Sequence, residues 1–393
     1  MIDFPASPTL GQTFTAAGVT WTWDGTKWTA TGASVAYLPL TGGTLTGPVV
    51  LAADPTANLQ AATKQYADAG VSAAVAAIRY GDNRVINGDM RINQRGVTNS
   101  AAGGYTVDRW QCTVTQPNKG SWIANTQTNL PGFYSSLGFQ SSSAYALLAT
   151  DAFQFFQTVE ADMVSDFAWG SSAAQPVTLS FWVLTSLTGT FSGSIRNYAA
   201  TRSYPFTYSI PVASTWTKIV VTIPGDTAGT WVLNGNGGSF YVTFDLGTGT
   251  TYRGPANAWV SANYIGVPGA QSIVAVNGAS LFVTGVKLEI GSVATPYNRQ
   301  SLAKSLADCQ RYYSIGTVYF IGSANSGFGI GGSAFFPVTM RANPTVTPSR
   351  SGVINLSNFT SNYLGLNSLY DFGLMTANGQ GQYSLNWTAS AEL

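Results

Sequence analysis

The chain has 393 residues, of which only 9% are charged, and its 18 basic and 17 acidic side chains give a formal net charge of +1. Globular proteins usually have about 25% charged residues, and a neutral balance argues against electrostatic capture of nucleic acid or an anionic membrane. The chain has no histidine, which excludes the commonest general base and the commonest zinc ligand.

Aromatic residues make up 13% of the chain, and glycine occurs 43 times. This composition is typical of many short strands joined by polar turns, so we expect a mainly β fold. The first residues, MIDFPASPTL, lack the basic and apolar regions of a signal peptide, and no apolar run approaches the roughly 18 residues that span a bilayer. We expect no membrane insertion. Cys112 and Cys309 are interpreted as buried or incidental thiols.

Residues 1–34 form the first predicted unit, a small hairpin module. Trp21-Thr22-Trp23 alternates apolar and polar residues, Asp24-Gly25 is a hairpin turn signal, and the alternation resumes at Lys27. Four large aromatic residues are expected to form a small core: Phe14, Trp21, Trp23 and Trp28. This core either only stabilises the fold or also attaches the module to a larger particle.

Residues 35–80 are predicted to be a turn-rich collar followed by a helix. The Gly42-Gly43 pair and several prolines give way to an alanine-rich run from about residue 58 to 79, which favours a helix. The helix has one narrow apolar stripe, which is best buried against copies of itself. The predicted trimerisation residues are Leu59, Tyr66, Val71, Val75 and Ile78.

Both N-terminal stretches resemble parts of tailed-bacteriophage tail-fibre proteins. FPASPTLGQTFTAAGVTWTWDGTKW is similar to a short N-terminal module of such virion proteins, and LPLTGGTLTGPVVLAADPTANLQAATKQYAD resembles a unit that precedes or lies within their stalks. The matching positions of the second unit run from Leu40 to Gly47, then Pro55, then Ala61 to Asp68. The resemblance implies a homotrimer, and the single copy of the unit implies a short stalk.

Residues 81–300 are predicted to be a jelly-roll β-sandwich, because strand-like runs follow one another without a convincing helix. The runs are 153–160, 177–186, 190–198, 204–210, 217–223, 229–233, 239–246 and 280–290. NGDMRINQRG, YTVDRW, VTLSFWV, GDTAGTW and LFVTGVKLEIGSVATPY together resemble a jelly-roll domain of phage fibre proteins that is akin to carbohydrate-binding modules.

That resemblance implies a glycan as ligand, and aromatic rings would stack on its sugars. The candidates are five aromatic residues in expected loops: Trp122, Tyr134, Trp169, Tyr198 and Trp259. Each of these side chains either contacts the ligand or packs within the protein. Phe181, Trp182 and Trp231 lie in strand-like runs and are expected in the core.

Residues 301–393 are predicted to be a short helix and a small C-terminal β tip. Leu302, Leu306 and Cys309 share one face of a helix over 303–313. The rest has glycine breaks, prolines and short β runs, and is either a recognition tip or a plain β surface.

No catalytic or metal site is predicted. Glu160, Asp162 and Asp166 are the densest acidic cluster, interpreted as solvated loop carboxylates or a structural calcium site. GFGIGGSAFF lacks the Lys-Ser/Thr ending of a phosphate-binding loop.

We therefore expect a virion structural protein without enzymatic activity or cofactor, made in the bacterial host cytoplasm: a trimeric tail fibre or receptor-binding protein. Its partners are two further copies of itself, a tail or baseplate protein at the N-terminus, and a host-surface glycan. A head-decorating fibre bound to the capsid and a polysaccharide-degrading tailspike are the alternatives.

Overall fold

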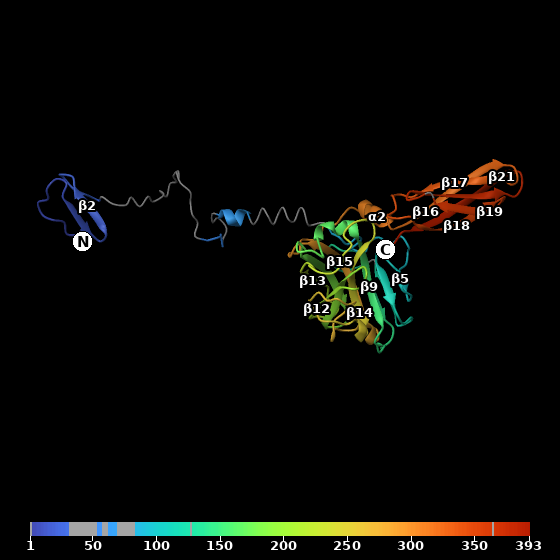
Figure 1. Ribbon diagram of the computed structural model, residues 1–393, viewed down its shortest axis with the longest axis horizontal. Coiled ribbons are helices and arrows are strands. Elements are labelled where there is room, and N and C mark those ends of the chain that lie inside the picture. Colours follow the sequence, from blue (N-terminus) through green and yellow to red (C-terminus); the bar gives the residue numbers. More distant parts are fainter. Residues whose placement is uncertain (1, 31–52, 57–61, 69–82, 126–127, 364) are drawn as a thin grey trace. The chain divides into compact units, whose positions relative to one another are not determined.

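The computed structural model describes residues 2–30, 53–56, 62–68, 83–125, 128–363 and 365–393 (Figure 1). Contacts divide the chain into two units, Met1–Val71 and Ser72–Leu393. The mainly β fold class predicted from the sequence is confirmed.

The first unit contains the predicted tryptophan hairpin. Asp24 fixes its turn, because Oδ1 accepts hydrogen bonds from the backbone N–H groups of Lys27 and Thr26, both at 2.9 Å. These bonds, that of Lys27 foremost, hold the pKa of Asp24 below its usual value. The hairpin belongs to a three-stranded antiparallel sheet of β1 (Thr13–Ala16), β2 (Val19–Trp23) and β3 (Trp28–Ala30).

The aromatic side chains of this sheet form the expected mini-core. Phe4, which sequence reasoning did not select, lies at its centre: its ring stacks on Trp28 with centroids 5.3 Å apart and lies 5.5 Å from Phe14 and 5.3 Å from Trp21. Trp23 contacts Trp28 at 5.7 Å. The role of this core in attachment stays a prediction.

A helical segment is present where the stalk helix was predicted. Residues 64–68 are helical, and the Thr63 hydroxyl caps them by accepting a hydrogen bond from the Tyr66 backbone N–H at 3.0 Å. The Tyr66 side chain is exposed. The other predicted trimerisation residues lie outside the described residues: Leu59, Val71, Val75 and Ile78.

The second unit begins with a jelly-roll sandwich of two six-stranded antiparallel sheets, ordered β13-β10-β15-β8-β7-β4 and β12-β11-β14-β9-β6-β5 (Figure 1). Five of its strands are β4 (Asn99–Ser100), β5 (Gly104–Tyr105), β6 (Gln111–Val114), β7 (Gly120–Asn125) and β8 (Ser136–Ser141). The others are β9 (Ala152–Glu160), β10 (Val177–Thr185), β11 (Gly189–Asn197), β12 (Ser203–Ile210), β13 (Thr217–Ile223), β14 (Gly238–Thr248) and β15 (Ser280–Ile290).

Almost every predicted strand of the sandwich is present. The exception is 229–233, which is a loop in the structure. The sequence did not predict β4–β8, of which β4 and β5 have only two residues each. Three 3-10 helices also occur: η1 (Ala161–Phe167), η2 (Thr250–Tyr252) and η3 (Ile273–Ala275).

Aromatic side chains fill the space between the two sheets. The Phe244 ring, on β14, lies 5.0 Å from that of Phe155 and 4.9 Å from that of Phe181, which comes from the opposite sheet. All three rings are buried. Burying each such side chain contributes about 1.5–3 kcal/mol, and ring pairing adds about 0.5–1.5 kcal/mol.

A short helix and a smaller sandwich follow. The helix α2 (Leu302–Gln310) lies within the predicted region, but its buried residues are Ser305 and Cys309, whereas Leu302 is exposed. Two three-stranded sheets, β16-β21-β18 and β17-β20-β19, then pack face to face. Their strands are β16 (Tyr313–Ala324), β17 (Gly329–Phe335), β18 (Thr345–Ile354), β19 (Leu356–Tyr363), β20 (Ser368–Met375) and β21 (Gly379–Ser390).

Buried ion pairs tie the smaller sandwich to the jelly roll. Glu392 pairs with Arg95 at 3.0 Å and also with Arg109, and Glu160 at the end of β9 pairs with Arg311 at 2.9 Å. The side chain of Glu160 is 2% exposed and that of Glu392 is 8% exposed, which strengthens these contacts relative to pairs at a solvent-exposed surface, although Arg311 is itself 42% exposed.

Both cysteines are free and buried, as expected. Burial raises the pKa of the Cys112 thiol to about 12, so this thiol stays protonated at neutral pH. Within the described ranges, no helix has the length and apolar character needed to cross a lipid bilayer.

The smaller sandwich contains one charge pair that joins its two sheets. Arg350 Nε on β18 donates to Asp371 Oδ2 on β20 at 3.0 Å, and Asp371 is fully buried. We predict that Asp371→Ala lowers the local stability by about 3–5 kcal/mol, because it leaves a largely buried guanidinium without a counter-charge. Hydrogen exchange of β16–β21 peptides in the full chain measures this loss. The double variant Arg350→Met/Asp371→Leu should recover most of it; equal losses in both variants would contradict the charge argument.

Candidate functional site

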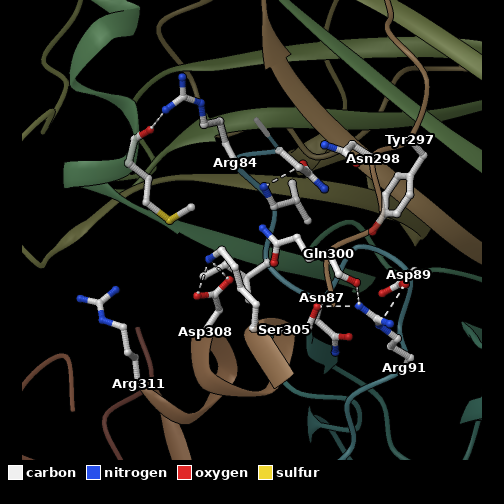
Figure 2. A pocket seen from close by; sticks show the side chains of 15 residues that line it. Arg84, Asn87, Asp89, Arg91, Tyr297, Asn298, Gln300, Ser305, Asp308 and Arg311 are labelled. Atoms are coloured by element: carbon white, nitrogen blue, oxygen red, sulfur yellow. Dashed lines mark hydrogen bonds and ion pairs between the residues drawn. The ribbon is translucent and has the colours of Figure 1, made fainter. Parts of the chain in front are cut away.

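A polar pocket lies where the chain enters the jelly roll (Figure 2). Its volume is about 330 Å³, and its lining comes from residues 83–91, from η1, from the segment after β15 and from α2. The lining residues include four cations: Arg84, Arg91, Lys304 and Arg311.

Each cation of the polar pocket already has a carboxylate partner. Arg84 pairs with Asp166 at 2.7 Å and Arg311 pairs with Glu160. Arg91 pairs with Asp89 at 3.2 Å and Lys304 pairs with Asp308 at 2.9 Å (Figure 2). Burial raises the pKa of Asp89, against the opposing charges of Arg91 and Arg299. Because the charges are compensated and Tyr297 is the only aromatic residue among the described ones that line it, we assign this pocket a structural role.

An aromatic pocket of about 310 Å³ lies next to it on the outer face of the sheet that contains β10, β13 and β15. The two pockets share Tyr297. The aromatic pocket is lined by Gly132, Phe133, Ser180, Phe181, Trp182, Lys218, Gly285, Thr295, Pro296, Tyr297 and Arg299.

An irregularity in strand pairing creates the space between the aromatic rings. The register of β10 against β15 shifts between Ser180 and Trp182, and Gly285 lies opposite this shift with a φ of 61°. A Cβ at Gly285 would lie 2.7 Å from the Phe133 ring and 3.2 Å from that of Trp182. Glycine is therefore required there both by the left-handed backbone and by the two rings.

Three rings and two cations surround the aromatic pocket. Phe133 and Tyr297 meet edge to face with centroids 5.2 Å apart, and the Arg299 guanidinium lies 5.4 Å from the centre of the Phe133 ring. Lys218 on β13 is the cross-strand partner of Trp182. Ring faces pack on the apolar C–H face of a sugar, and charged or hydroxyl groups bond its polar substituents. Among the described residues that line the aromatic pocket, none carries a carboxylate.

Two aromatic residues that the sequence placed in loops are buried in the core. Trp122 lies in β7 with 0% exposure and packs on Phe139 at 4.8 Å. Trp169 is 3% exposed, lies 4.7 Å from Trp231, and donates its indole N–H to the Gln175 carbonyl oxygen at 2.8 Å. The loop assignment of Trp122 was wrong, and neither ring has a free face for a sugar.

The other three candidates differ in exposure. Trp259 is half-buried against Trp169, with centroids 5.3 Å apart, while Tyr134 is 64% and Tyr198 43% exposed. Tyr198 lies 5.5 Å from Tyr241, on the sheet opposite the aromatic pocket, so it forms a separate aromatic surface. The structure does not bring the five together.

Sequence reasoning missed Trp182, which it placed in the core. Trp182 is half-buried and lines the aromatic pocket. A signal was present in LFVTGVKLEI, because a glycine inside a strand pattern indicates a bulge or a close approach. The half-buried Trp231 lies in a loop, not in the predicted strand.

The acidic cluster also differs from expectation. Asp162 and Asp166 are exposed in η1, but Glu160 is buried and accepts hydrogen bonds from Arg311 and Tyr312, so it is not a solvated loop carboxylate. Across the part of the chain that the structure describes, no three His, Cys, Asp or Glu side chains are arranged to hold a metal ion.

No protein-family model and no curated protein matches the sequence. Solved structures similar to this chain include the enzymatically active domain of tailspike protein 4 from bacteriophage CBA120, at 15% identity and a TM-score of 0.30; the match covers 53% of this chain and 21% of that one. The C-terminal family 22 carbohydrate-binding module of Xyn10B from Clostridium thermocellum is similar at 11% identity and a TM-score of 0.27, over 48% of this chain and 91% of that one. The family 11 carbohydrate-binding module of a Clostridium thermocellum cellulosomal cellulase is similar at 10% identity and a TM-score of 0.25, over 50% of this chain and 99% of that one.

Gly285→Ala tests how the aromatic pocket is built. We predict a larger loss of stability than for Gly278→Ala, whose φ is also positive, at 75°, but whose Cβ would meet no atom within 4 Å. The control costs about 1–2 kcal/mol of backbone strain, and Gly285→Ala costs about 1–3 kcal/mol more because it displaces the rings. Urea unfolding measures both, and equal losses would contradict the pocket geometry.

Proposed function

We propose that this chain is a structural protein of a tailed-bacteriophage virion, a trimeric tail fibre or receptor-binding protein that binds a host-surface glycan. The N-terminal module and the following collar unit support the virion assignment by their resemblance to fibre proteins. The compact aromatic core around Phe4 and Trp28 suits a small domain that docks onto a tail or baseplate protein.

The aromatic pocket is the observation that carries glycan binding. It is hollow, it lies on the outer face of a sheet, and it combines the rings of Phe133, Trp182 and Tyr297 with polar groups. Its volume of about 310 Å³ lies at the lower end of the range for small-ligand sites, which is about 300–1,000 Å³. Three such sites in a trimer would bind a repetitive surface polysaccharide with higher avidity than one.

The proposed activity is binding without cleavage. Glycoside hydrolysis usually requires two carboxyl groups on either side of the scissile bond. The residues that line the aromatic pocket include no Asp or Glu, so this pocket lacks the groups that a polysaccharide-degrading tailspike would use there.

The smaller sandwich supports trimerisation through an apolar row. Ile315, Tyr319 and Ile321 alternate along the outer face of β16, an edge strand, and all three are exposed. Rows of large apolar side chains on a surface are typical of contacts with another protein. In a cyclic trimer each such contact would occur three times.

Trp182→Ala is predicted to weaken glycan binding by more than about 10-fold, because a tryptophan anchor commonly contributes 2 kcal/mol or more. The measurement is binding of the full chain to a panel of bacterial capsular and O-antigen polysaccharides. Tyr198→Ala serves as the aromatic control on the opposite sheet and should leave binding unchanged. Loss with Tyr198→Ala alone would contradict the pocket assignment, and absence of binding to the whole panel would contradict glycan recognition.

The full chain is predicted to have three chain masses by light scattering at micromolar concentration. Tyr319→Ser/Ile321→Ser should lower that mass on dilution, because each buried apolar side chain contributes about 1.5–3 kcal/mol. Leu148→Ser, which alters an exposed leucine of the jelly roll, should leave the trimer intact. A monomeric unaltered chain would disprove the trimer, and an unaffected double variant would disprove the role of β16.

A further inference from the structure

We infer that the aromatic pocket selects an acidic saccharide, one whose ring carries a carboxylate or another anionic substituent. This inference rests on the proposed glycan-binding function and adds the charge of the ligand. It follows from the balance of charges around the pocket.

The charged residues that line the aromatic pocket are all positive. Lys218 and Arg299 line the pocket, and no Asp or Glu of the described ranges does. The chain as a whole is nearly neutral, with 18 basic and 17 acidic side chains, so this lining is more positive than the chain average.

Lys218 has no counter-charge. Within the described part of the chain, its ammonium group makes no ion pair and no hydrogen bond. The side chain is exposed on β13 beside Trp182. Its charge is therefore available to a ligand that lies against the tryptophan ring.

The neighbouring charged groups do not cancel this excess. Arg299 Nε lies 3.5 Å from Asp89, but Asp89 also pairs with Arg91 at 3.2 Å, so one carboxylate serves two cations. Behind the pocket, Lys287 and Glu289 pair with each other at 3.1 Å and are both buried. Together these groups and Lys218 leave a net excess of two positive charges.

The polar pocket shows the opposite arrangement and serves as an internal comparison. Its cations Arg84, Lys304 and Arg311 each pair with a separate carboxylate. Only Arg91 shares its partner, and that partner is the Asp89 that Arg299 also uses. Of these two pockets, the aromatic one therefore combines ring faces with uncompensated positive charge, and an anionic sugar matches both.

The test compares the full chain against a panel of acidic polysaccharides that carry uronate, sialate, phosphate or sulfate groups, together with carboxyl-reduced or desubstituted counterparts of each. We expect the chain to bind at least one acidic polymer about 10-fold or more tightly than the neutral counterpart of that polymer. The reason is that hydrogen bonds to charged groups are stronger than those between neutral groups. Binding should weaken as salt concentration rises. The panel separates carboxylates from phosphates and sulfates as the source of the charge.

Variants then assign the effect to residues. Lys218→Gln should reduce affinity for the acidic polymer about 10-fold and leave affinity for the neutral counterpart unchanged, whereas Trp182→Ala reduces both. Lys119→Gln, which alters a lysine outside the pocket, is the charge control and should have no effect. Thermal unfolding of Lys218→Gln should match the unaltered chain, because the side chain is exposed.

The outcomes separate this inference from the proposed function. Equal binding of acidic and neutral polymers, or a Lys218→Gln variant that binds the acidic polymer normally, overturns the charge inference while glycan binding stands. Binding to no polymer of either kind overturns both.

Discussion

The packing of aromatic rings between the two sheets of the jelly roll is the interaction on which the rest of the structure depends. Phe244 contacts rings from both sheets, at 5.0 Å to Phe155 and 4.9 Å to Phe181, and these rings are excluded from water. Because this core is formed by side chains of the inner faces and of loops that cover its ends, the outer faces are free to carry pockets. The loops have to provide hydrogen bonds for their own backbone N–H and C=O groups. Some of them, such as the loop that contains Trp169, also place side chains in the core.

Charged side chains are few in this chain, and most of the ion pairs that they form lie within the second unit. Glu160, Asp371 and Glu392 accept from arginines that come from distant parts of the sequence, and these pairs connect sheets or join the two sandwiches. A buried pair loses much of its strength to desolvation but strongly disfavours any arrangement that separates its members. The pairs therefore specify how the β elements assemble. Lys218, by contrast, is an exposed lysine without a carboxylate partner among the described residues; it lies beside Trp182, a residue that lines a pocket, and this position gives it a functional interpretation.

The aromatic pocket shows how a small backbone irregularity creates a binding surface. The shift in register at Trp182 needs a left-handed residue opposite it, and only glycine at 285 leaves room for the neighbouring rings. Regular pairing would have kept the ladder of side chains continuous over this face. Trp182 follows the core residue Phe181 directly along β10, so alternation along the strand places it on the outer face, where it is half-buried.

The sequence by itself determined the mainly β class, the tryptophan hairpin and most strands of the jelly roll, because alternation and turn residues act over a few positions. It also indicated a helix at α2, but the apolar spacing did not predict the buried face, since Ser305 is buried and Leu302 is exposed. Only the tertiary structure decided which aromatic rings are exposed: Trp122 and Trp169 are core residues, whereas Trp182 lines a pocket. It also decided that Glu160 is a buried, paired carboxylate, because its partner Arg311 lies 151 positions away in the sequence. Such contacts depend on the register and stacking of whole sheets, which no local pattern encodes.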